Sequence, residues 1–237
     1  NFGKGKTSPT GKITADNSGL TGKVTFFDTS DYDGLNNEND YLFGGRSSTI
    51  FKADEQSLQE IYTTGNDFEV KTAAYLPNNF NCSNDDATID DRSGKKGPEA
   101  EAVTIGQIED KTFAFIGLER IGGIMVYDIT NPEKTEFVNY INSRDFSTDI
   151  GGDDSPEGIH FIAGNDSITG KPQLVVAYEV SGTVGVYDLT LQKNSDQSGD
   201  DKTDNPSQEP TVEETNNSSN TNTNNKNHSV NTGDASN

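Results

Sequence analysis

The sequence predicts an all-β protein: a partial β-propeller of about three four-stranded antiparallel blades, followed by a disordered tail. Two stretches of the chain repeat at an offset of sixty residues, and each repeat consists of short apolar runs separated by glycine turns. The third observation is that the last part of the chain has almost nothing to bury. The hydrophobic fraction of the 237 residues is only 29%, and the shortfall lies mainly after position 190.

The repeat is extended rather than local. Residues 111–130, KTFAFIGLERIGGIMVYDIT, align with residues 171–190, KPQLVVAYEVSGTVGVYDLT, so that Glu119 falls on Glu179. Upstream of these stretches, the two units begin with the similar motifs Gly97-Pro98-Glu99 and Ser155-Pro156-Glu157. Such agreement predicts two copies of one supersecondary unit.

Each unit is predicted to consist of β-strands. Its apolar runs are short and rich in β-branched and aromatic residues, and glycine-containing pairs before the third strand predict tight hairpins. The first unit is expected to contain strands at Pro98–Gly106, Phe113–Leu118, Ile124–Ile129 and Phe137–Ile141, and the second at Leu174–Tyr178 and Val184–Leu189. Four antiparallel strands in a unit of this length are typical of a propeller blade.

A fainter third copy occupies residues 40–65. Tyr41–Phe43 takes the place of the second strand of a unit, Thr49–Phe51 takes the place of the third, and residues 22–28 are predicted to form a single strand that leads into this copy. Evidence for helices is thin, since Asp54–Tyr62 fits a helical turn or a turn and strand equally well. Because known propellers have about four to eight blades, we expect further blades upstream of Asn1, or pairing with another chain.

Composition divides the chain into three parts and excludes one function class. Residues 1–22 are predicted to be a linker or partial strand, residues 23–190 the propeller blades, and residues 191–237 a disordered spacer rich in Asn, Ser, Thr and Asp. The formal charge of −21 lies mostly outside the spacer and excludes nucleic-acid binding, which needs basic residues on the phosphates. It suits an extracellular protein.

The single cysteine, Cys82, excludes an intrachain disulfide framework, and a cysteine-poor extracellular protein favours a bacterial cell surface. The sequence has no apolar run near the ~20 residues that span a bilayer. It also has no recognisable signal peptide, so we read the chain as a fragment or mature piece.

The motifs of residues 90–147, which contain Gly-Pro-Glu, Ile-Gly-Leu-Glu-Arg and Asn-Ser-Arg-Asp-Phe, together with the later Ser-Pro-Glu-Gly, resemble the choice-of-anchor I domain family. That family is similar to mesenchyme-specific cell surface glycoproteins and to bacterial YVTN-type propellers. The likeness covers about residues 23–190 and implies a secreted or wall-attached propeller whose C-terminus varies between anchor types. Some members are labelled alkaline phosphatases or are joined to nucleotidase domains. The chain has Ala102 near a position where the family usually has glycine.

The tail offers one further resemblance. Thr232-Gly233 is similar to the Thr-Gly core of a Gram-positive sortase signal, although the usual Leu-Pro is missing. This reading predicts attachment to the cell wall through a C-terminal anchor. A chance occurrence in a region rich in Thr, Asn and Gly is the alternative.

Acidic residues recur where each unit begins, and they are the candidate metal ligands. The predicted set for Ca²⁺, which prefers oxygen ligands, is Glu99, Glu101, Asp153, Asp154 and Glu157. Further acidic and basic residues are candidates for binding or for structural ion pairs that repeat from blade to blade: Glu119, Arg120, Glu179 and Arg144. Repetition favours the structural reading of the latter set.

Two loops also concentrate oxygen ligands, at residues 28–38 and 81–92, and a solvated turn is the simpler reading of both. The acids near Cys82 are expected to raise its pKa. The two histidines, His160 and His228, do not combine with serine and aspartate motifs into a catalytic set.

Two functions follow from these patterns. The first is a cell-surface propeller for binding or adhesion, displayed on a polar stalk and recognising a protein or glycan. The alternative is a calcium-dependent phosphatase or phytase-like hydrolase, which would need basic residues at the same mouth. The candidates for that role are Arg92, Lys95, Lys96, Arg120 and Arg144. The absence of a catalytic motif favours the first function over an enzyme.

Overall fold

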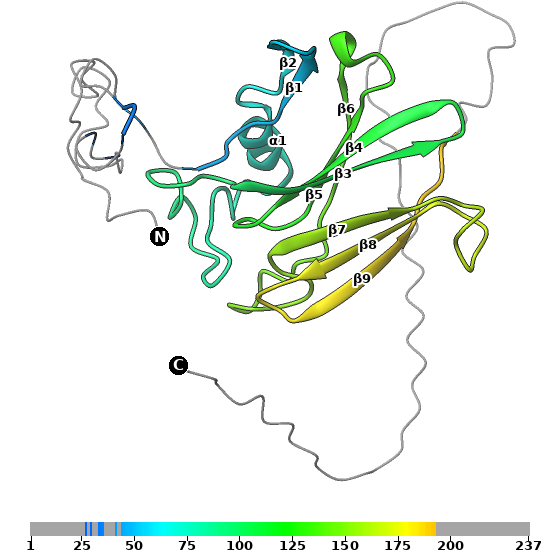
Figure 1. Cartoon of the computed structure of the whole chain (residues 1–237). Helices are drawn as coiled ribbons and strands as arrows, with labels where there is room; N and C mark the ends of the chain where they lie inside the picture. Colours follow the sequence, from blue (N-terminus) through cyan, green and yellow to red (C-terminus); the bar gives the residue numbers. More distant parts are fainter. Residues whose placement is uncertain (1–26, 28, 30–32, 36–40, 42–43, 193–237) are drawn as a thin grey trace, which may run out of the picture.

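The computed structural model describes residues 27, 29, 33–35, 41 and 44–192 (Figure 1). The predicted linker, most of the strand expected at residues 22–28, most of the loop at 28–38 and nearly all of the predicted spacer, with Thr232-Gly233, lie outside the described residues. The elements in chain order are β1 (Thr49–Ala53), β2 (Leu58–Thr63), α1 (Asp67–Tyr75), β3 (Ala100–Ile108), β4 (Lys111–Leu118), β5 (Ile124–Asp128), a short 3-10 helix (Pro132–Lys134), β6 (Glu136–Ile141), β7 (Pro156–Ile162), β8 (Gln173–Tyr178) and β9 (Thr183–Asp188). No helix in this part of the chain is long and apolar enough to cross a membrane.

The predicted all-β class is confirmed. The strands form three antiparallel sheets: the hairpin β1-β2, the four-stranded sheet β3-β4-β5-β6 and the three-stranded sheet β7-β8-β9. Each strand predicted for the two repeats is present, with ends shifted by a residue or two. The sheets follow one another along the chain, as blades of a propeller do, but the described residues do not close a ring.

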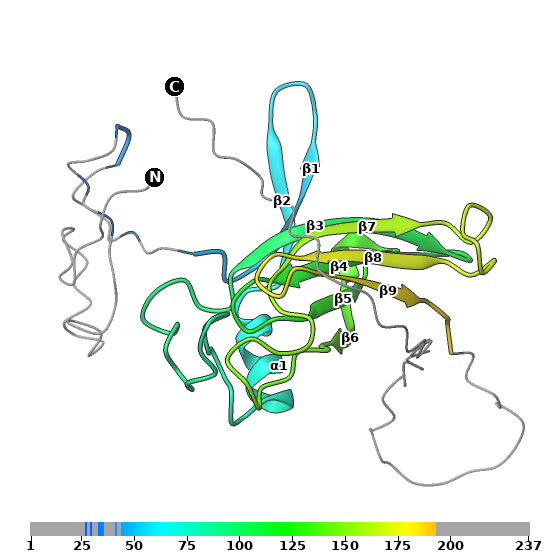
Figure 2. The ribbon, with the colours of Figure 1, turned by 90° about the horizontal axis from the view of Figure 1, so that it is seen from below.

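The two larger sheets pack face to face, and their contact forms one hydrophobic core (Figures 1 and 2). Alternate side chains of β4 and β5, such as Phe115 and Val126, lie against Leu174 and Val176 of β8. Phe115 stacks on Phe161 of β7 with ring centroids 6.1 Å apart. This is the stacking of sheet on sheet that a repeated blade requires, since a single sheet leaves both faces exposed.

A second core covers the opposite face of the β3–β6 sheet. Helix α1 supplies Phe68, which packs edge-on against Tyr127 at a centroid distance of 6.0 Å. The Tyr127 hydroxyl donates a hydrogen bond to Asp67 at 2.7 Å. The sequence analysis did not predict α1. Its apolar signal is weak because only Phe68 and Thr72, one turn apart, are fully buried.

Among the described residues the three sheets have two, four and three strands, whereas the sequence predicted about four in each. The described part of the third copy is a two-stranded hairpin, in which Thr49–Ala53 contains the predicted strand and Asp54–Tyr62 forms a turn and β2 rather than a helical turn. Most of the strand expected at Tyr41–Phe43 lies outside the described residues. The β7–β9 sheet has no described fourth strand. The corresponding position, sixty residues after β6, reads DQSGDD at residues 196–201 and lies outside the described residues.

Candidate functional site

The predicted site residues gather at one end of the two larger sheets, which we call the polar end. It is formed by the loop before β3, the β4–β5 turn, the β6–β7 loop and the β8–β9 turn (Figure 1). The opposite end carries the β3–β4 and β7–β8 connections. The antiparallel hairpins account for this arrangement, because each returns the chain to the same end.

Matching β-bulges place one glutamate in each sheet. The β3–β4 register shifts between Ala100 and Ala102, and the β7–β8 register shifts between Pro156 and Gly158. Glu101 and Glu157 are therefore equivalent bulged residues, and bulges commonly redirect a side chain beside a site. The similar Pro-Glu motifs suggested that Glu99 and Glu157 correspond, and this alignment is off by two residues.

The residue before each bulged segment has the same backbone role. Glu99 and Ser155 both have a positive φ, at 54° and 67°. The carbonyl of Glu99 accepts the Glu119 N–H at 2.9 Å, and the carbonyl of Ser155 accepts the Glu179 N–H at 2.8 Å. The sequence repeat of Glu119 and Glu179 thus reflects a repeated turn geometry.

Three carboxylates converge at the start of the first sheet. Glu99, Glu101 and Glu119 each have a carboxylate oxygen within 4.8 Å of the others. Burial, hydrogen bonds to Glu101 and Glu99 and the charge of Glu99 raise the pKa of Glu119 to about 9, and Arg120 opposes the shift. The trio therefore favours a proton, or another cation, on Glu119 at neutral pH.

Basic and amide groups tie this trio together. Arg120 Nε donates to Glu99 at 2.6 Å, and its terminal nitrogens contact Glu119 at 2.9 Å and Asn84 Oδ1 at 2.8 Å. Lys96 forms an ion pair with Glu99. Burial acts to raise the pKa of Glu99, but hydrogen bonds from Glu119, Lys96 and Arg120 outweigh it and lower the pKa. Glu119 thus contacts Arg120, the residue next to it in the chain.

The second sheet contributes an exposed acidic pair. Glu157 and Glu179 both lie at the surface of the polar end. Desolvation is the largest cause that raises the pKa of Glu157, and the negative charges of Glu179 and Glu101 raise it further. These acids thus extend the negative field of the trio from the first sheet to the second.

The remaining two predicted metal ligands lie in separate networks. Asp153 accepts hydrogen bonds from Thr183 at 2.7 Å, Ser143 at 2.9 Å and Tyr187 at 3.2 Å. These contacts fasten the β6–β7 loop to β9. Asp153 is thus held by hydroxyl groups, and the structure does not bring it to Glu99 and Glu101.

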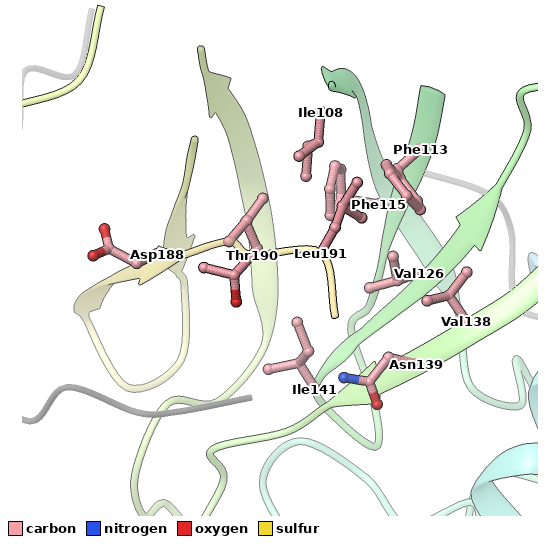
Figure 3. A pocket seen from close by; sticks show the side chains of 11 residues that line it. Ile108, Phe113, Phe115, Val126, Val138, Asn139, Ile141, Asp188, Thr190 and Leu191 are labelled. Carbon is pink, nitrogen blue, oxygen red and sulfur yellow. The ribbon is translucent and has the colours of Figure 1, made fainter. Parts of the chain in front are cut away.

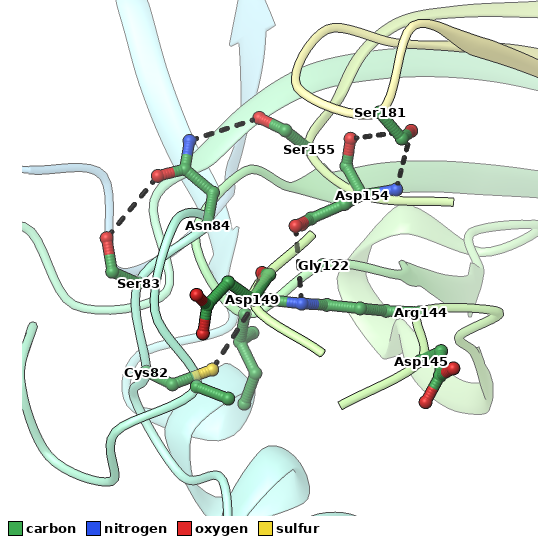
Figure 4. Close-up of polar contacts among 12 residues, drawn as sticks. Cys82, Ser83, Asn84, Gly122, Arg144, Asp145, Asp149, Asp154, Ser155 and Ser181 are labelled. Carbon is green, nitrogen blue, oxygen red and sulfur yellow. Dashed lines mark hydrogen bonds and ion pairs between the residues drawn. The ribbon is translucent and has the colours of Figure 1, made fainter. Parts of the chain in front are cut away.

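Asp154 pairs with Arg144 inside the protein (Figure 4). Both side chains are 0% exposed, and Arg144 Nε lies 3.4 Å from Asp154 Oδ2. Burial raises the pKa of Asp154 to about 6, and the Arg144 charge opposes the rise. Arg144 also donates to the Arg120 carbonyl at 2.9 Å and to the Cys82 sulfur at 3.6 Å. One guanidinium therefore joins three loops of the polar end.

The loop at residues 81–92 is more than a solvated turn. Its first part is buried, and Asn84 donates to Glu119 at 3.1 Å and to Ser155 at 3.4 Å, which links the two repeats. Burial, rather than the nearby acids, is the main cause that raises the pKa of Cys82. Sequence reasoning noticed the oxygen-rich loop and named Lys96 as a candidate phosphate-binding residue, but it missed Asn84 as a member of the site, because Asn84 has no counterpart in the repeat.

Comparison with known proteins gives a family match and two curated relatives. A family model described as the choice-of-anchor I domain matches residues 4–132. Gigasin-3a of Magallana gigas is 29% identical over 168 residues, which is 63% of this chain and 57% of the relative. A mesenchyme-specific cell surface glycoprotein of Strongylocentrotus purpuratus is 24% identical over 106 residues, 40% of this chain and 14% of the relative. The chain thus spans only part of each relative, and no solved structure matches it.

Proposed function

Because this chain belongs to the choice-of-anchor I domain family, we propose that it is a module of the cell surface that binds a protein or glycan ligand through its polar end. Extracellular placement is supported by the printed name of the sea-urchin relative and by the net charge of −21.

The observation that carries the proposal is the state of the charged groups at the polar end. Arg120, Lys96 and Arg144 are each held by carboxylates or carbonyls of the protein itself. The exposed acids Glu101, Glu157 and Glu179 are left to face solvent. Such a surface is suited to cationic ligands, or to ligands that a cation bridges, and it disfavours anions.

Calcium is the proposed bridging cation, with Glu99, Glu101 and Glu119 as its ligands. Ca²⁺ takes carboxylate oxygens at about 2.3–2.6 Å, and three carboxylates that already converge need little rearrangement. The raised pKa of Glu119 supports this assignment, since an ion could replace the proton that the trio favours. Asp153 and Asp154 are not part of this set, because their contacts hold them elsewhere.

Calcium titration of the full chain at pH 8 tests the assignment. We expect Glu101→Gln and Glu119→Gln each to weaken Ca²⁺ binding by about tenfold or more, because each removes one charged ligand. Glu136→Gln is the matched control, since Glu136 is exposed on β6 away from the trio. Isothermal titration calorimetry gives the affinities. Unchanged binding in both trio variants would remove the calcium site from the proposal.

The pH dependence of stability should report on Glu119. Its folded pKa of about 9 lies above the ordinary value of 4.5, so the stability that its protonated form contributes is complete below pH 4.5 and is lost as the pH rises toward 9. In EDTA we expect the melting temperature to fall by on the order of 5 °C between pH 6.5 and pH 9.

In Glu119→Gln this fall should be largely absent, because the amide does not ionise. The same window lies above the pKa of about 6 of Asp154, so that group adds little to the slope. Calorimetric melts of both proteins across the pH series make the comparison. Equal slopes would show that Glu119 does not hold a proton in the folded chain.

A calcium-dependent phosphoester hydrolase is the second candidate. The convergence of the carboxylates beside the Arg120 guanidinium favours it, since metal and arginine together can stabilise phosphoryl charge. The pairing of Arg120 with Glu99 at 2.6 Å counts against it. Turnover of p-nitrophenyl phosphate that requires Ca²⁺ and is lost in Glu101→Gln would establish the hydrolase and displace the binding module.

A further inference from the structure

No strand of the described residues pairs with the outer edge of β9, whereas the corresponding edge of the first sheet is covered. Among the described residues the strand order is β7-β8-β9 in one sheet and β3-β4-β5-β6 in the other. The registers make β9 equivalent to β5, because the Leu189 N–H donates to Pro172 and the Ile129 N–H donates to Thr112, each at 2.8 Å. In the first sheet β6 pairs with β5 on that edge.

The hydrogen-bonding groups on this edge can be assigned by alternation. Since Leu189 turns its N–H toward β8, the residues at odd spacings from it, Val186 and Val184, turn their N–H and carbonyl groups to the free edge. Their side chains are 58% and 65% exposed, whereas the equivalent Val126 and Ile124 are buried. Within the part of the chain that the structure describes, β9 thus presents unpaired backbone groups beside apolar side chains, which is the condition for strand addition.

A groove between the sheets lies where β9 ends (Figure 3). Its hollow of about 80 Å³ is lined by Val126, Val138 and Ile141 of the first sheet and by Leu189 and Leu191, which follow β9. Val138 and Ile141 belong to the core between the sheets but are only partly buried. A fourth strand in the second sheet would set its inward side chains over them.

The residues at the corresponding position of this chain do not fit that role. Sixty residues after β6, whose sequence is EFVNYI, the chain reads DQSGDD. An occupant that continues the core needs apolar side chains of the β6 kind.

We propose that the free edge of β9 accepts an extended strand from a separate polypeptide, with large apolar residues spaced as in β6. The added strand continues the backbone ladder of the β7–β9 sheet and extends the existing core between the two sheets. Backbone pairing supplies affinity in such additions, and side-chain pockets supply selectivity. The site is distinct from the polar end, so it stands whether or not that end binds calcium.

A peptide that copies residues 135–142, TEFVNYIN, is the probe, because β6 already fills the equivalent position. We expect the fluorescently labelled peptide to bind the full chain by anisotropy, and a scrambled peptide of the same composition to bind at least tenfold more weakly. Hydrogen exchange should slow at the amides of Val184 and Val186 in the complex.

Val186→Pro removes one edge N–H without removing a hydrogen bond to β8, and proline is tolerated on edge strands in this orientation. We expect it to weaken peptide binding at least tenfold. Val186→Thr, which keeps the N–H and the branched shape, should bind within about threefold of the native chain, and circular dichroism checks that both variants are folded.

Three results would overturn the proposal. The peptide could fail to bind the folded native chain, or bind Val186→Pro as well as the native protein. Sedimentation could instead show that the chain dimerises and that Val186→Pro abolishes the dimer, in which case the occupant is a second copy. Loss of calcium binding in the Glu101→Gln protein would leave peptide binding unchanged.

Discussion

Replacing Arg144 with leucine is expected to lower the free energy of unfolding by about 3–5 kcal/mol. The substitution leaves the Asp154 carboxylate fully buried without its counter-charge. It also removes the hydrogen bond to the Arg120 carbonyl and the contact with Cys82, so that three loops lose their common partner. Urea denaturation followed by circular dichroism measures the change.

The double variant Arg144→Leu with Asp154→Asn separates the two contributions. Because the amide carries no charge, the double variant should be more stable than Arg144→Leu by about 1–3 kcal/mol. Arg144→Lys, which keeps the charge on a different geometry, is expected to fall between the native chain and Arg144→Leu. A loss below about 1 kcal/mol in Arg144→Leu would mean that the pair does not hold the polar end together.

The strands of the two repeats could be predicted because their burial alternates in a simple way. Phe113–Leu118 and Ile124–Ile129 have both faces covered, so the sequence shows continuous apolar runs. Helix α1 gave no such signal, since a nine-residue helix with two fully buried side chains has too few apolar positions to show a period. The hairpin β1-β2 was anticipated only in part, because its strands are mostly exposed.

The sequence could identify the residues of the candidate site, but not which of these residues lie together. Sequence reasoning selected Glu99 and Glu101, and the structure adds Glu119 to them through the β4–β5 turn. The sequence reasoning also placed Asp154 with these acids. Residues that are neighbours in the sequence can, however, point to opposite sides of a loop. Asp154 turns inward to Arg144, ten residues before it, and that pairing depends on how the β6–β7 loop closes.

Two residues that share no sequence motif, Gly106 on β3 and Phe161 on β7, provide the sharpest test of the packing between the sheets. A Cβ atom at Gly106 would overlap the ring of Phe161, which itself stacks on Phe115 with an interplanar angle of 17°. The glycine therefore lets the first strands of the two sheets approach closely. This close approach of β3 to β7 arises from the packing of the two sheets against each other and not from either sheet alone.

Gly106→Val should accordingly destabilise the chain by about 3 kcal/mol, at the upper end for an overpacked core, because the valine must displace the Phe161 ring from its place between the sheets. Urea denaturation gives this value, and the Phe161→Leu background supplies the control. With the ring absent, the added cost of Gly106→Val should fall to about 1 kcal/mol, a coupling expected only for residues in direct contact. If Gly106→Val lowered the free energy of unfolding equally in both backgrounds, the two sheets would not meet at this position, and the propeller-like packing of the sheets would be wrong.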